Sequence, residues 1–444
     1  MNFDQIMAIV IFLAMFISIM LDKWHRYLSA LGGAVLTLVF VFRNFDGIMW
    51  VLNFREIFQG CFWIVHGAKC EVSHGVNWQT IIFISGMMVM IEGLELVGFF
   101  RWLCFLVAKV VKYRVLPIFV AFFLLSGFLA MFIDSITVLL FLSSVTVELA
   151  HLLKFNPVPL IIAEIFAANT GGSATMSGDP PNIIIGTSLN FSFFDFLLNT
   201  GVIAWIGMIV ALGYFYLVFR RSLTAEHPAG VKYPRPAEAI KNKPLFYAFA
   251  CVFLTVITLL VTHNLTGISV AFIGCIAAFF ILIIAFKKSR MILKRLDWRT
   301  ILFFVGLFIC VGGLEHTGVL KLLADFIGRV SGANAILLVS LILWISAFAS
   351  SIVDNIPFAA TMVPVIAGLA RNGMPLGPLS WSLALGADIG GNGTPIGASA
   401  NVVGLARAEE EGYHIGWLEF CRYAMPAMIL VILLCNIYLI IRYF

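Results

Sequence analysis

The sequence has little charge. Only 11% of its 444 residues are Asp, Glu, Lys or Arg, whereas 61% are hydrophobic. Soluble domains carry about 25% charged residues, so this chain has less than half the usual share. Apolar runs close to the ~20 residues that cross a bilayer recur from end to end. These features exclude a soluble enzyme, a nucleic-acid-binding protein and a disordered scaffold. They predict an all-α, multi-pass membrane protein that is not an enzyme.

Other chemical signatures are also missing. The eight cysteines show no Cys-x-x-Cys and no metal-ligand spacing with histidine, so we expect neither a metal nor another cofactor. Cys61 and Cys70 share one loop and could pair only if that loop faces an oxidising compartment. No Gly-Lys-Ser/Thr follows the glycine-rich segments, which excludes a phosphate-binding loop. The first apolar run lacks a basic lead and a cleavage site, so we expect a retained helix over residues 5–21.

Basic residues are concentrated in two loops. Residues 220–243 hold six Lys or Arg against two Glu, and residues 287–299 hold six Lys or Arg. Loops rich in Lys and Arg face the cytoplasm, so both loops are predicted to be cytoplasmic. Working backwards, the N-terminus lies outside, and five crossings precede the first basic loop. The chain is therefore predicted to span a cytoplasmic, or inner, membrane.

The chain also contains an internal repeat. Asn77-Trp78-Gln79-Thr80-Ile81 matches Asp297-Trp298-Arg299-Thr300-Ile301 at an offset of 220 residues, as do Asp134 and Asp354. A third match, at an offset of 219, pairs the glycine-rich segments 171–182 and 390–401. Collinear matches at nearly one offset indicate a duplicated half.

The predicted topology makes this duplication an inverted one. The first Asn/Asp-Trp motif enters the membrane from outside and the second from the cytoplasm, which is the architecture of secondary transporters. We expect a first repeat over residues 1–219, a cytoplasmic linker over 220–244 and a second repeat over 245–444. We expect about ten transmembrane helices plus two re-entrant hairpins and two broken helices.

The two glycine-rich segments are the predicted broken helices. Glycine and proline prevent regular helix there, and non-helical backbone at membrane depth survives only where it is buried or lines a cavity. Broken segments in matching positions of two halves point to a binding site. A simple helix kink is the alternative for a single segment. The glycines expected to shape this backbone are Gly171, Gly172, Gly178, Gly390, Gly391 and Gly397.

Three aspartates are candidates for proton or ion coupling. Asp134 and Asp354 lie near the middle of long apolar stretches and are expected at the tips of re-entrant hairpins, whereas Asp179 lies in the first broken segment. An ionisable residue at membrane depth is costly, so it is a functional hypothesis by default. The alternative is a structural carboxylate that is satisfied by helix N-termini.

Polar residues around these aspartates form the candidate substrate site. They are Ser135, Thr137, Asn169, Ser173, Thr175, Asn182, Asn355, Asp388, Asn392, Thr394 and Asn401. No Lys or Arg occurs in residues 115–153, 155–219 or 380–406. A cation, a proton or a neutral polyol-like solute therefore fits this set more directly than a multiply charged anion.

These motifs resemble the ion transporter superfamily. The resemblance rests on Gly172-Ser173-Ala174-Thr175-Met176-Ser177-Gly178-Asp179-Pro180-Pro181-Asn182 and on Gly390-Gly391-Asn392-Gly393-Thr394-Pro395-Ile396-Gly397-Ala398-Ser399-Ala400-Asn401. It covers essentially the whole chain, and the most similar branch is that of the arsenite efflux permeases and melanosomal P proteins, which share a citrate transporter-like domain. The resemblance implies a carrier in which hairpins and broken helices meet at mid-membrane.

For function, the resemblance implies export of arsenite or antimonite in exchange for protons, alone or with a cytoplasmic arsenite-stimulated ATPase. These solutes are uncharged trihydroxides near neutral pH, which suits a pocket of hydroxyls and amides. Related branches exchange sodium for protons or import di- and tricarboxylates with sodium. The carboxylate branch has Ser-Asn-Thr at its hairpin tips, from which Asp134-Ser135-Ile136-Thr137 and Asp354-Asn355-Ile356-Pro357 depart.

Our leading hypothesis is proton-coupled arsenite or antimonite efflux. The alternatives are a sodium/proton antiporter, with Na⁺ in place of a solute, and a sodium-coupled di- or tricarboxylate or other anion carrier. An intramembrane aspartyl protease would also need two membrane aspartates. The Gly-x-Gly-Asp signature is missing before Asp179 and Asp354, and this argues against it.

Overall fold

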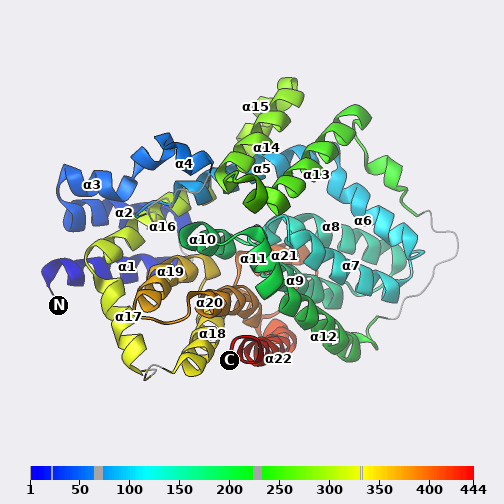
Figure 1. Cartoon of the computed structure of the whole chain (residues 1–444). Helices are drawn as coiled ribbons and strands as arrows, with labels where there is room; N and C mark the ends of the chain where they lie inside the picture. The colour runs from blue at the N-terminus through cyan, green and yellow to red at the C-terminus, as the bar shows by residue number, and fades with distance from the viewer. Residues whose placement is uncertain (1, 22–23, 65–73, 224–232, 331, 333) are drawn as a thin grey trace.

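The computed structural model describes residues 2–21, 24–64, 74–223, 233–330, 332 and 334–444. Within these residues the regular structure is helical, apart from one isolated bridge between Ile64 and Ile268 (Figure 1). Of the two cysteines that share a loop, Cys61 is described and Cys70 lies outside the described ranges, so the question of their pairing falls there.

In the described part of the predicted first repeat there are twelve α-helices, some of them extended by short π or 3₁₀ turns. They are α1 (Phe3–Met20), α2 (Arg26–Thr37), α3 (Phe45–Leu52), α4 (Gly60–Trp63), α5 (Trp78–Val97), α6 (Phe99–Val110), α7 (Val115–Ala130), α8 (Ser135–Leu153), α9 (Val158–Gly172), α10 (Pro180–Leu189), α11 (Phe193–Phe196) and α12 (Val202–Phe219).

Ten α-helices follow the linker in the residues that the structure describes there. They are α13 (Lys243–Thr266), α14 (Val270–Ile284), α15 (Ser289–Arg295), α16 (Trp298–His316), α17 (Val319–Val330), α18 (Ala335–Ile352), α19 (Asn355–Arg371), α20 (Leu376–Gly390), α21 (Ser399–Glu410) and α22 (Trp417–Tyr443).

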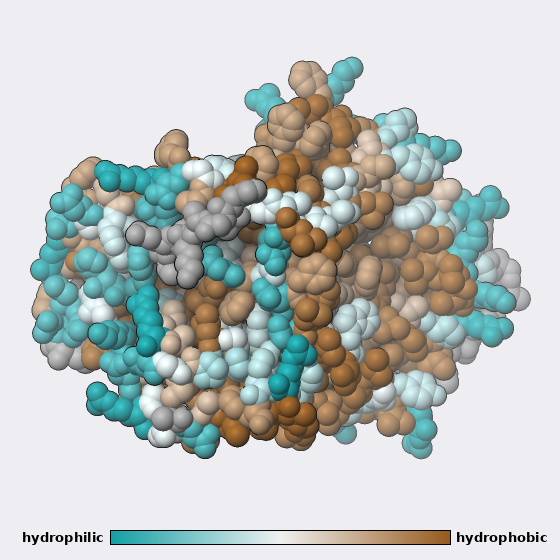
Figure 2. Space-filling view, viewed as in Figure 1, coloured by the Kyte–Doolittle hydropathy of each residue, from teal (hydrophilic) through white to brown (hydrophobic). Residues whose placement is uncertain are grey.

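Eight helical segments in the described residues are long and apolar enough to cross a membrane, or nine with the pair α14–α15, which bends by 98°. Four apolar helices are shorter, and three of these (115–130, 158–172 and 355–371) lie in the predicted hairpins and broken helices. Large apolar side chains such as Phe279 and Leu254 are exposed. Hydrophobic residues cover much of the centre and right of the face in Figure 2. The chain is therefore a multi-pass, all-helical membrane protein, as the composition predicts.

The repeated Asn/Asp-Trp motif starts a helix in both halves. The side chain of Asn77 accepts a hydrogen bond from the amide of Thr80 at the start of α5, and Asp297 accepts one from Thr300 at the start of α16. These are N-caps, which satisfy amides that have no partner within the helix. The motif therefore fixes where two long helices begin.

Each long apolar stretch breaks at its aspartate. Asp134 separates α7 from α8, and Asp354 separates α18 from α19. The helices α7 and α8 pack against each other and against α9, while α18 and α19 pack against each other and against α20. Each stretch is thus a pair of helices lying beside the first arm of a broken segment.

The two halves are in close contact. Helix α2 packs against α16, and α14 packs against α5. A Cβ on Gly86 would overlap the carbonyl of Gly274, and one on Gly306 would lie 2.6 Å from the carbonyl carbon of Ala30. Small residues let membrane helices approach this closely. The glycines therefore hold helices from different halves together.

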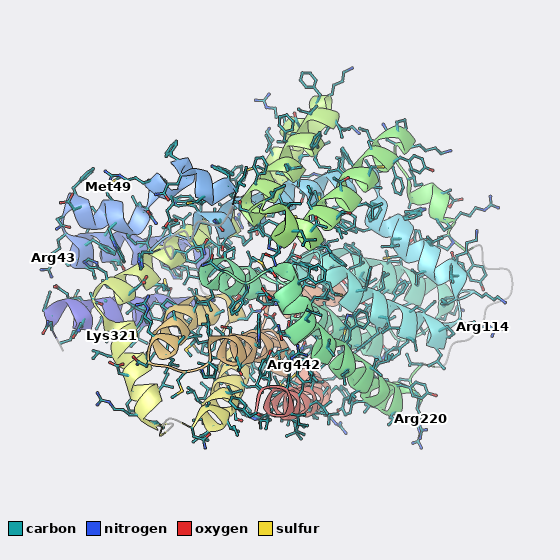
Figure 3. All side chains as sticks on the ribbon, in the orientation of Figure 1. Arg43, Met49, Arg114, Arg220, Lys321 and Arg442 are labelled. Atoms are coloured by element: carbon teal, nitrogen blue, oxygen red, sulfur yellow. The ribbon has the colours of Figure 1, made fainter. Side chains whose placement is uncertain are left out.

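Part of the basic linker packs against the helices. Its short 3₁₀ turn, Pro236–Ala239, contacts α6, and the hydroxyl of Tyr113 donates to the carbonyl of Pro234 over 2.5 Å. Arg114 and Arg220 lie on the same side of the view in Figure 3. Both are expected to face the cytoplasm.

Candidate functional site

The first broken segment is held open by one asparagine. Helix α9 ends at Gly172 and α10 starts at Pro180. The amide nitrogen of Asn182 donates to the carbonyls of Gly172 and Thr175, at 3.0 and 3.1 Å. Gly178 packs so closely on Gly172 that any Cβ would overlap its carbonyl oxygen. The freed carbonyls are therefore satisfied inside the protein, as buried polar groups must be.

The second broken segment repeats this arrangement. Asn401 lies in the first turn of α21. Its amide nitrogen donates to the carbonyls of Gly391 and Thr394 in the segment between α20 and α21, at 2.7 and 2.8 Å. A Cβ on Gly397 would lie 2.5 Å from the carbonyl oxygen of Gly391. The glycine positions named by the sequence thus allow the two chain segments to fold back on themselves.

Hydroxyls of the broken segments bind the ends of the preceding helices. Thr175 donates to the carbonyl of Met131 after α7, and Thr394 donates to the carbonyl of Ser351 in α18. Ser173 donates only to the carbonyl of Thr170 within its own segment. The two threonines therefore link each broken segment to its helical pair.

Asp179 contacts both helical pairs. One carboxylate oxygen accepts from the hydroxyl of Ser135 at 2.7 Å, and the other accepts from the amide of Asn355 at 2.8 Å. Ser135 begins α8 and Asn355 begins α19. Asp179 is only 4% exposed. A single buried carboxylate therefore joins the two predicted hairpin tips.

Asp134 and Asp354 act as helix caps. Asp134 accepts from the amide and the hydroxyl of Thr137, at 2.9 and 2.8 Å. Asp354 accepts from the amide of Ile356 at 3.2 Å. These are the helix-terminus contacts that the structural alternative for the two aspartates requires. Thr137 bonds Asp134 and, unlike Ser135, makes no bond to Asp179 in the described residues.

Arg26 is the residue of this site that the sequence did not indicate. Its guanidinium donates to Asp354 at 2.8 Å and to the hydroxyl of Ser399 at 2.5 Å. The Arg26 and Asp354 side chains are 39% and 13% exposed. Nothing in the sequence singles out Arg26, because basic residues commonly flank membrane spans. Only tertiary packing brings the start of α2 to α19 and α21.

A buried amide cluster connects the two broken segments. The amide nitrogen of Asn169 donates to the side-chain oxygens of Asn392 and Asn401, at 2.9 and 2.7 Å. The nitrogen of Asn392 donates in turn to the hydroxyl of Thr170 at 3.3 Å. Three predicted site residues from both halves thus form one hydrogen-bonded group.

Four buried oxygens at this centre have no hydrogen-bond partner among the described residues. They are both carboxylate oxygens of Asp388 and the side-chain oxygens of Asn169 and Asn182. The side chain of Asp388 lies against those of Asp179, Asn182 and Asn355. An unpaired buried polar atom is costly, so these oxygens select a ligand that supplies hydrogen-bond donors or positive charge.

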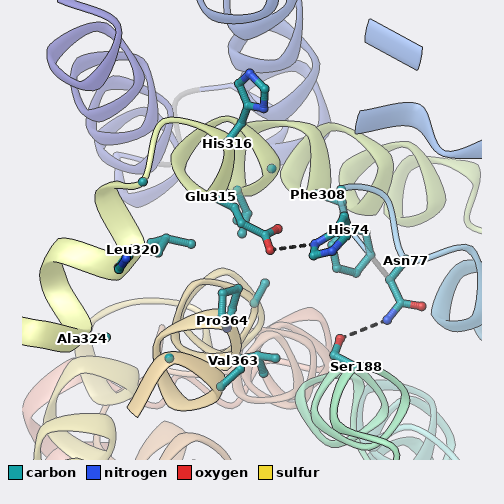
Figure 4. A pocket seen from close by; sticks show the side chains of 18 of the residues that line it. His74, Asn77, Ser188, Phe308, Glu315, His316, Leu320, Ala324, Val363 and Pro364 are labelled. Atoms are coloured by element: carbon teal, nitrogen blue, oxygen red, sulfur yellow. Dashed lines mark hydrogen bonds and ion pairs between the residues drawn. The ribbon is translucent and has the colours of Figure 1, made fainter. Parts of the chain in front are cut away.

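A cavity of about 560 Å³ lies beside α19. Its lining includes Glu315, Lys321 and Pro364. Figure 4 shows Glu315 bound to His74, at 3.1 Å, and the amide of Asn77 donating to Ser188, also at 3.1 Å. The cavity is therefore bordered by charged and polar groups from α16, α17 and α10.

A second cavity, of about 360 Å³, lies beside α8. Its lining includes Glu95, Arg101 and Ser144, each 220 residues before a residue that lines the first cavity. It also reaches Thr137, next to Asp134. The two helical pairs thus carry cavities at matching positions.

Comparisons with known proteins agree with this arrangement. Residues 16–386 match the family model described as "Citrate transporter". A 46 kDa membrane protein of Mycobacterium leprae is 33% identical over 99% of both chains, and an uncharacterized transporter of Mycobacterium tuberculosis is also 33% identical over 99% of both. The human P protein is 26% identical over 85% of this chain and 55% of its own length.

The fold has a solved counterpart. The YdaH transporter of Alcanivorax borkumensis, described as having an unusual topology, superposes with a TM-score of 0.54 over 99% of this chain and 98% of its own, at 13% identity. At this identity the likeness concerns the fold alone. The family match, the relatives and the fold together show that the chain belongs to the citrate transporter family of the ion transporter superfamily and is a multi-pass membrane transporter.

Proposed function

We propose that the chain is a secondary transporter that exports arsenite or antimonite across the cytoplasmic membrane in exchange for protons. The observation that carries this proposal is the set of four unpaired oxygens on Asp388, Asn169 and Asn182. All four oxygens accept hydrogen bonds when Asp388 is ionised. Protonation of Asp388 would turn one of its two oxygens into a donor. The amide nitrogens of Asn169 and Asn182 are already engaged, so neither amide can be reversed without losing two bonds.

The chemistry of these atoms supports a neutral hydroxyl-rich solute. An uncharged arsenic or antimony trihydroxide offers three O–H donors to a site whose free groups are acceptors. A carboxylate or other anion would face the same acceptors with more negative charge. Arg26 is the guanidinium found at this centre in the described residues, and it is engaged by Asp354 and Ser399. The site therefore favours the metalloid solute over citrate-like anions.

The contacts of Asp179 support alternating access. One residue holds the starts of α8 and α19, and a cavity lies beside each of these helices. In our proposal the sequence halves 1–219 and 245–444 are inverted repeats, and the two cavities open to opposite sides. A proton gained or lost at this centre changes the charge that holds Ser135 and Asn355. One helical pair can then move while the other stays.

A sodium/proton antiporter is the second candidate. The two unpaired oxygens of Asp388 favour it, because hard cations prefer oxygen ligands. In that case Na⁺ takes the place of the metalloid, while Asp179 keeps its role at the helix starts. An arsenite-stimulated ATPase would be an added cytoplasmic partner and is not required by this mechanism.

Everted membrane vesicles that contain the protein test the proposal. With respiration supplying a proton gradient and no ATP added, we expect arsenite to accumulate and a protonophore to abolish that accumulation. Asp179→Asn should abolish it as well. Asp46→Asn is the matched control, because Asp46 is exposed in the first turn of α3. No accumulation with the unaltered chain would contradict the metalloid proposal, and sodium-dependent proton movement in the same vesicles would then support the second candidate.

A further inference from the structure

The two broken segments differ at one buried position. Asn401 and Asn182 both use their amide nitrogens to bind two carbonyls of their own segment. The side-chain oxygen of each is therefore left for a partner in the other half. For Asn401 that partner is the amide nitrogen of Asn169, at 2.7 Å.

The position that corresponds to Asn169 is Asp388. Asn169 precedes Gly172 by three residues, and Asp388 precedes Gly391 by three residues. Gly172 and Gly391 are the glycines whose carbonyls Asn182 and Asn401 bind. Asp388 lies against Asn182, as Asn169 lies against Asn401. One half thus has an amide donor where the other has a carboxyl group.

An ionised carboxylate leaves this second pair incomplete. The oxygen of Asn182 and both oxygens of Asp388 have no partner among the described residues, and both side chains are 0% exposed. Two acceptors form no hydrogen bond with each other, and a buried polar group without a partner is costly, more so if it is charged. Asn182 cannot present its nitrogen instead, because that atom already donates twice. A proton on Asp388 completes the pair.

We propose that Asp388 carries the coupling proton and donates it to the side-chain oxygen of Asn182 when the two broken segments are closed on each other. This inference rests on the proposed function and names the proton-carrying residue within it. When the segments separate, the O–H bond of Asp388 breaks and the proton passes to water on the open side. The product is a carboxylate beside Asp179.

The surroundings of Asp388 make the closed state depend on that proton. Helix α20 packs against α9, α10, α18, α19 and α22. Helix α18 has no titratable side chain, α19 has only Arg371 at its far end, and Glu164 of α9 is bound to Thr146. On α22 the titratable side chains are Glu419, Cys421, Arg422, Tyr423, Cys435, Tyr438, Arg442 and Tyr443. The charged group directly against Asp388 is Asp179, at the start of α10, and Asp179 in turn lies within electrostatic range of Asp134 and Asp354.

The arrangement has a consequence for coupling. Closing the site with Asp388 ionised would place two carboxylates side by side without water, and like charges at short range in a buried site repel strongly. Closure with a proton on Asp388 removes that repulsion and adds a hydrogen bond. The empty, unprotonated carrier is therefore hindered from closing, which prevents the gradient from leaking.

Infrared difference spectra of the full chain in lipid test this assignment without any substrate. We expect a carbonyl band from a protonated carboxylic acid that disappears as the pH is raised. That band should be absent in Asp388→Asn and present in Asp179→Asn and Asp388→Glu. Asp388→Asn is expected to fold, because it recreates the amide pair already formed by Asn169 and Asn401. An unchanged band in Asp388→Asn would overturn the inference.

A transport measurement supplies the second readout. In Asp388→Asn, accumulation of arsenite driven by a pH gradient should be lost. Full gradient-driven accumulation in Asp388→Asn would overturn the inference. A third outcome is possible, in which the unaltered chain moves no arsenite but shows the carboxylic acid band, and Asp388→Asn lacks that band. The proposed solute would then be wrong, and the assignment of the proton to Asp388 would stand.

Discussion

At the scale of single residues, Asp179 has two donors that come from separate helix starts. Ser135 and Asn355 each contribute one hydrogen bond, at 2.7 and 2.8 Å, and all three side chains are buried. Hydrogen bonds to a charged group in such a setting contribute more than neutral ones, about 1.5–3 kcal/mol each. The starts of α8 and α19 are therefore joined mainly by the two hydrogen bonds that Asp179 accepts.

Removing one donor should weaken the folded state. Ser135→Ala is expected to lower the free energy of unfolding by ~1–3 kcal/mol, because it leaves Asp179 short of a partner. Ser144→Ala is the matched control: Ser144 is exposed and bonds only a carbonyl of its own helix, so a change within ~0.5 kcal/mol is expected. Thermal unfolding of both purified variants measures the difference. Equal effects would contradict the role given to Asp179.

Arg26 and Asp354 form the other residue-scale contact that joins distant segments. A double-mutant cycle with Arg26→Gln and Asp354→Asn should give a coupling free energy of ~1 kcal/mol. This is less than a fully buried ion pair would give, because the Arg26 side chain is 39% exposed and solvent screens its charge. The Arg101–Glu148 pair, at 2.9 Å and 56% and 39% exposed, should couple less strongly. A larger coupling for Arg101 and Glu148 than for Arg26 and Asp354 would contradict this ranking.

At the scale of helices, much of the fold follows from sequence patterns. The breaks at Asp134 and Asp354 and the glycine-rich interruptions near 171–182 and 390–401 lie where the sequence predicts them. These features are local, since they depend on caps, glycine and proline. The contact of α2 with α16 could not be predicted in the same way, because no local pattern encodes which helices pack together.

The same distinction applies to the candidate site. The polar residues of the broken segments were identifiable as a group, yet the partners of each were not. Asn169 pairs with Asn401 only because α9 meets α21, and Asp388 lies against Asn182 only because α20 meets α10 in the folded chain. Arg26 joins the site from α2, which lies outside the two broken segments and outside both helical pairs. Chemistry could be predicted from residue type, but pairing required the tertiary structure.

The contact between α5 and α14 is the element-scale feature most open to test. Gly86→Ala should destabilise the protein by ~1–3 kcal/mol, because its Cβ overlaps the backbone of Gly274. Gly213→Ala, in α12, is the control, since a Cβ added at Gly213 meets nothing within 4 Å. There the better helix propensity of alanine should be neutral or stabilising by up to ~1 kcal/mol. Unfolding measurements that show Gly86→Ala to be no worse than Gly213→Ala would refute the close approach.

At the scale of the whole molecule, two cavities accompany the two helical pairs. Their lining residues correspond at the 220-residue offset of the sequence repeat, as Glu95 does to Glu315 and Arg101 to Lys321. In a carrier built from inverted halves, such cavities are the routes to the two sides. Alternating access therefore requires that the two cavities face opposite compartments.

Cysteine labelling can check this arrangement. In a chain whose eight native cysteines are replaced, Ser144→Cys should react with a membrane-impermeant thiol reagent from the cytoplasmic side. Ala367→Cys, which lines the other cavity, should react from outside. Labelling of both positions from the same side would contradict the inverted arrangement of the halves.

Proton movement in proteoliposomes that contain only this protein tests the central claim most directly. With a pH-sensitive dye inside and arsenite added to one side, we expect proton flow opposite to arsenite flow. This proton flow should be lost in Asp179→Asn and retained in Asp46→Asn. Sodium and citrate, added separately, serve as comparison solutes. Proton movement that responds to citrate but not to arsenite would contradict the account.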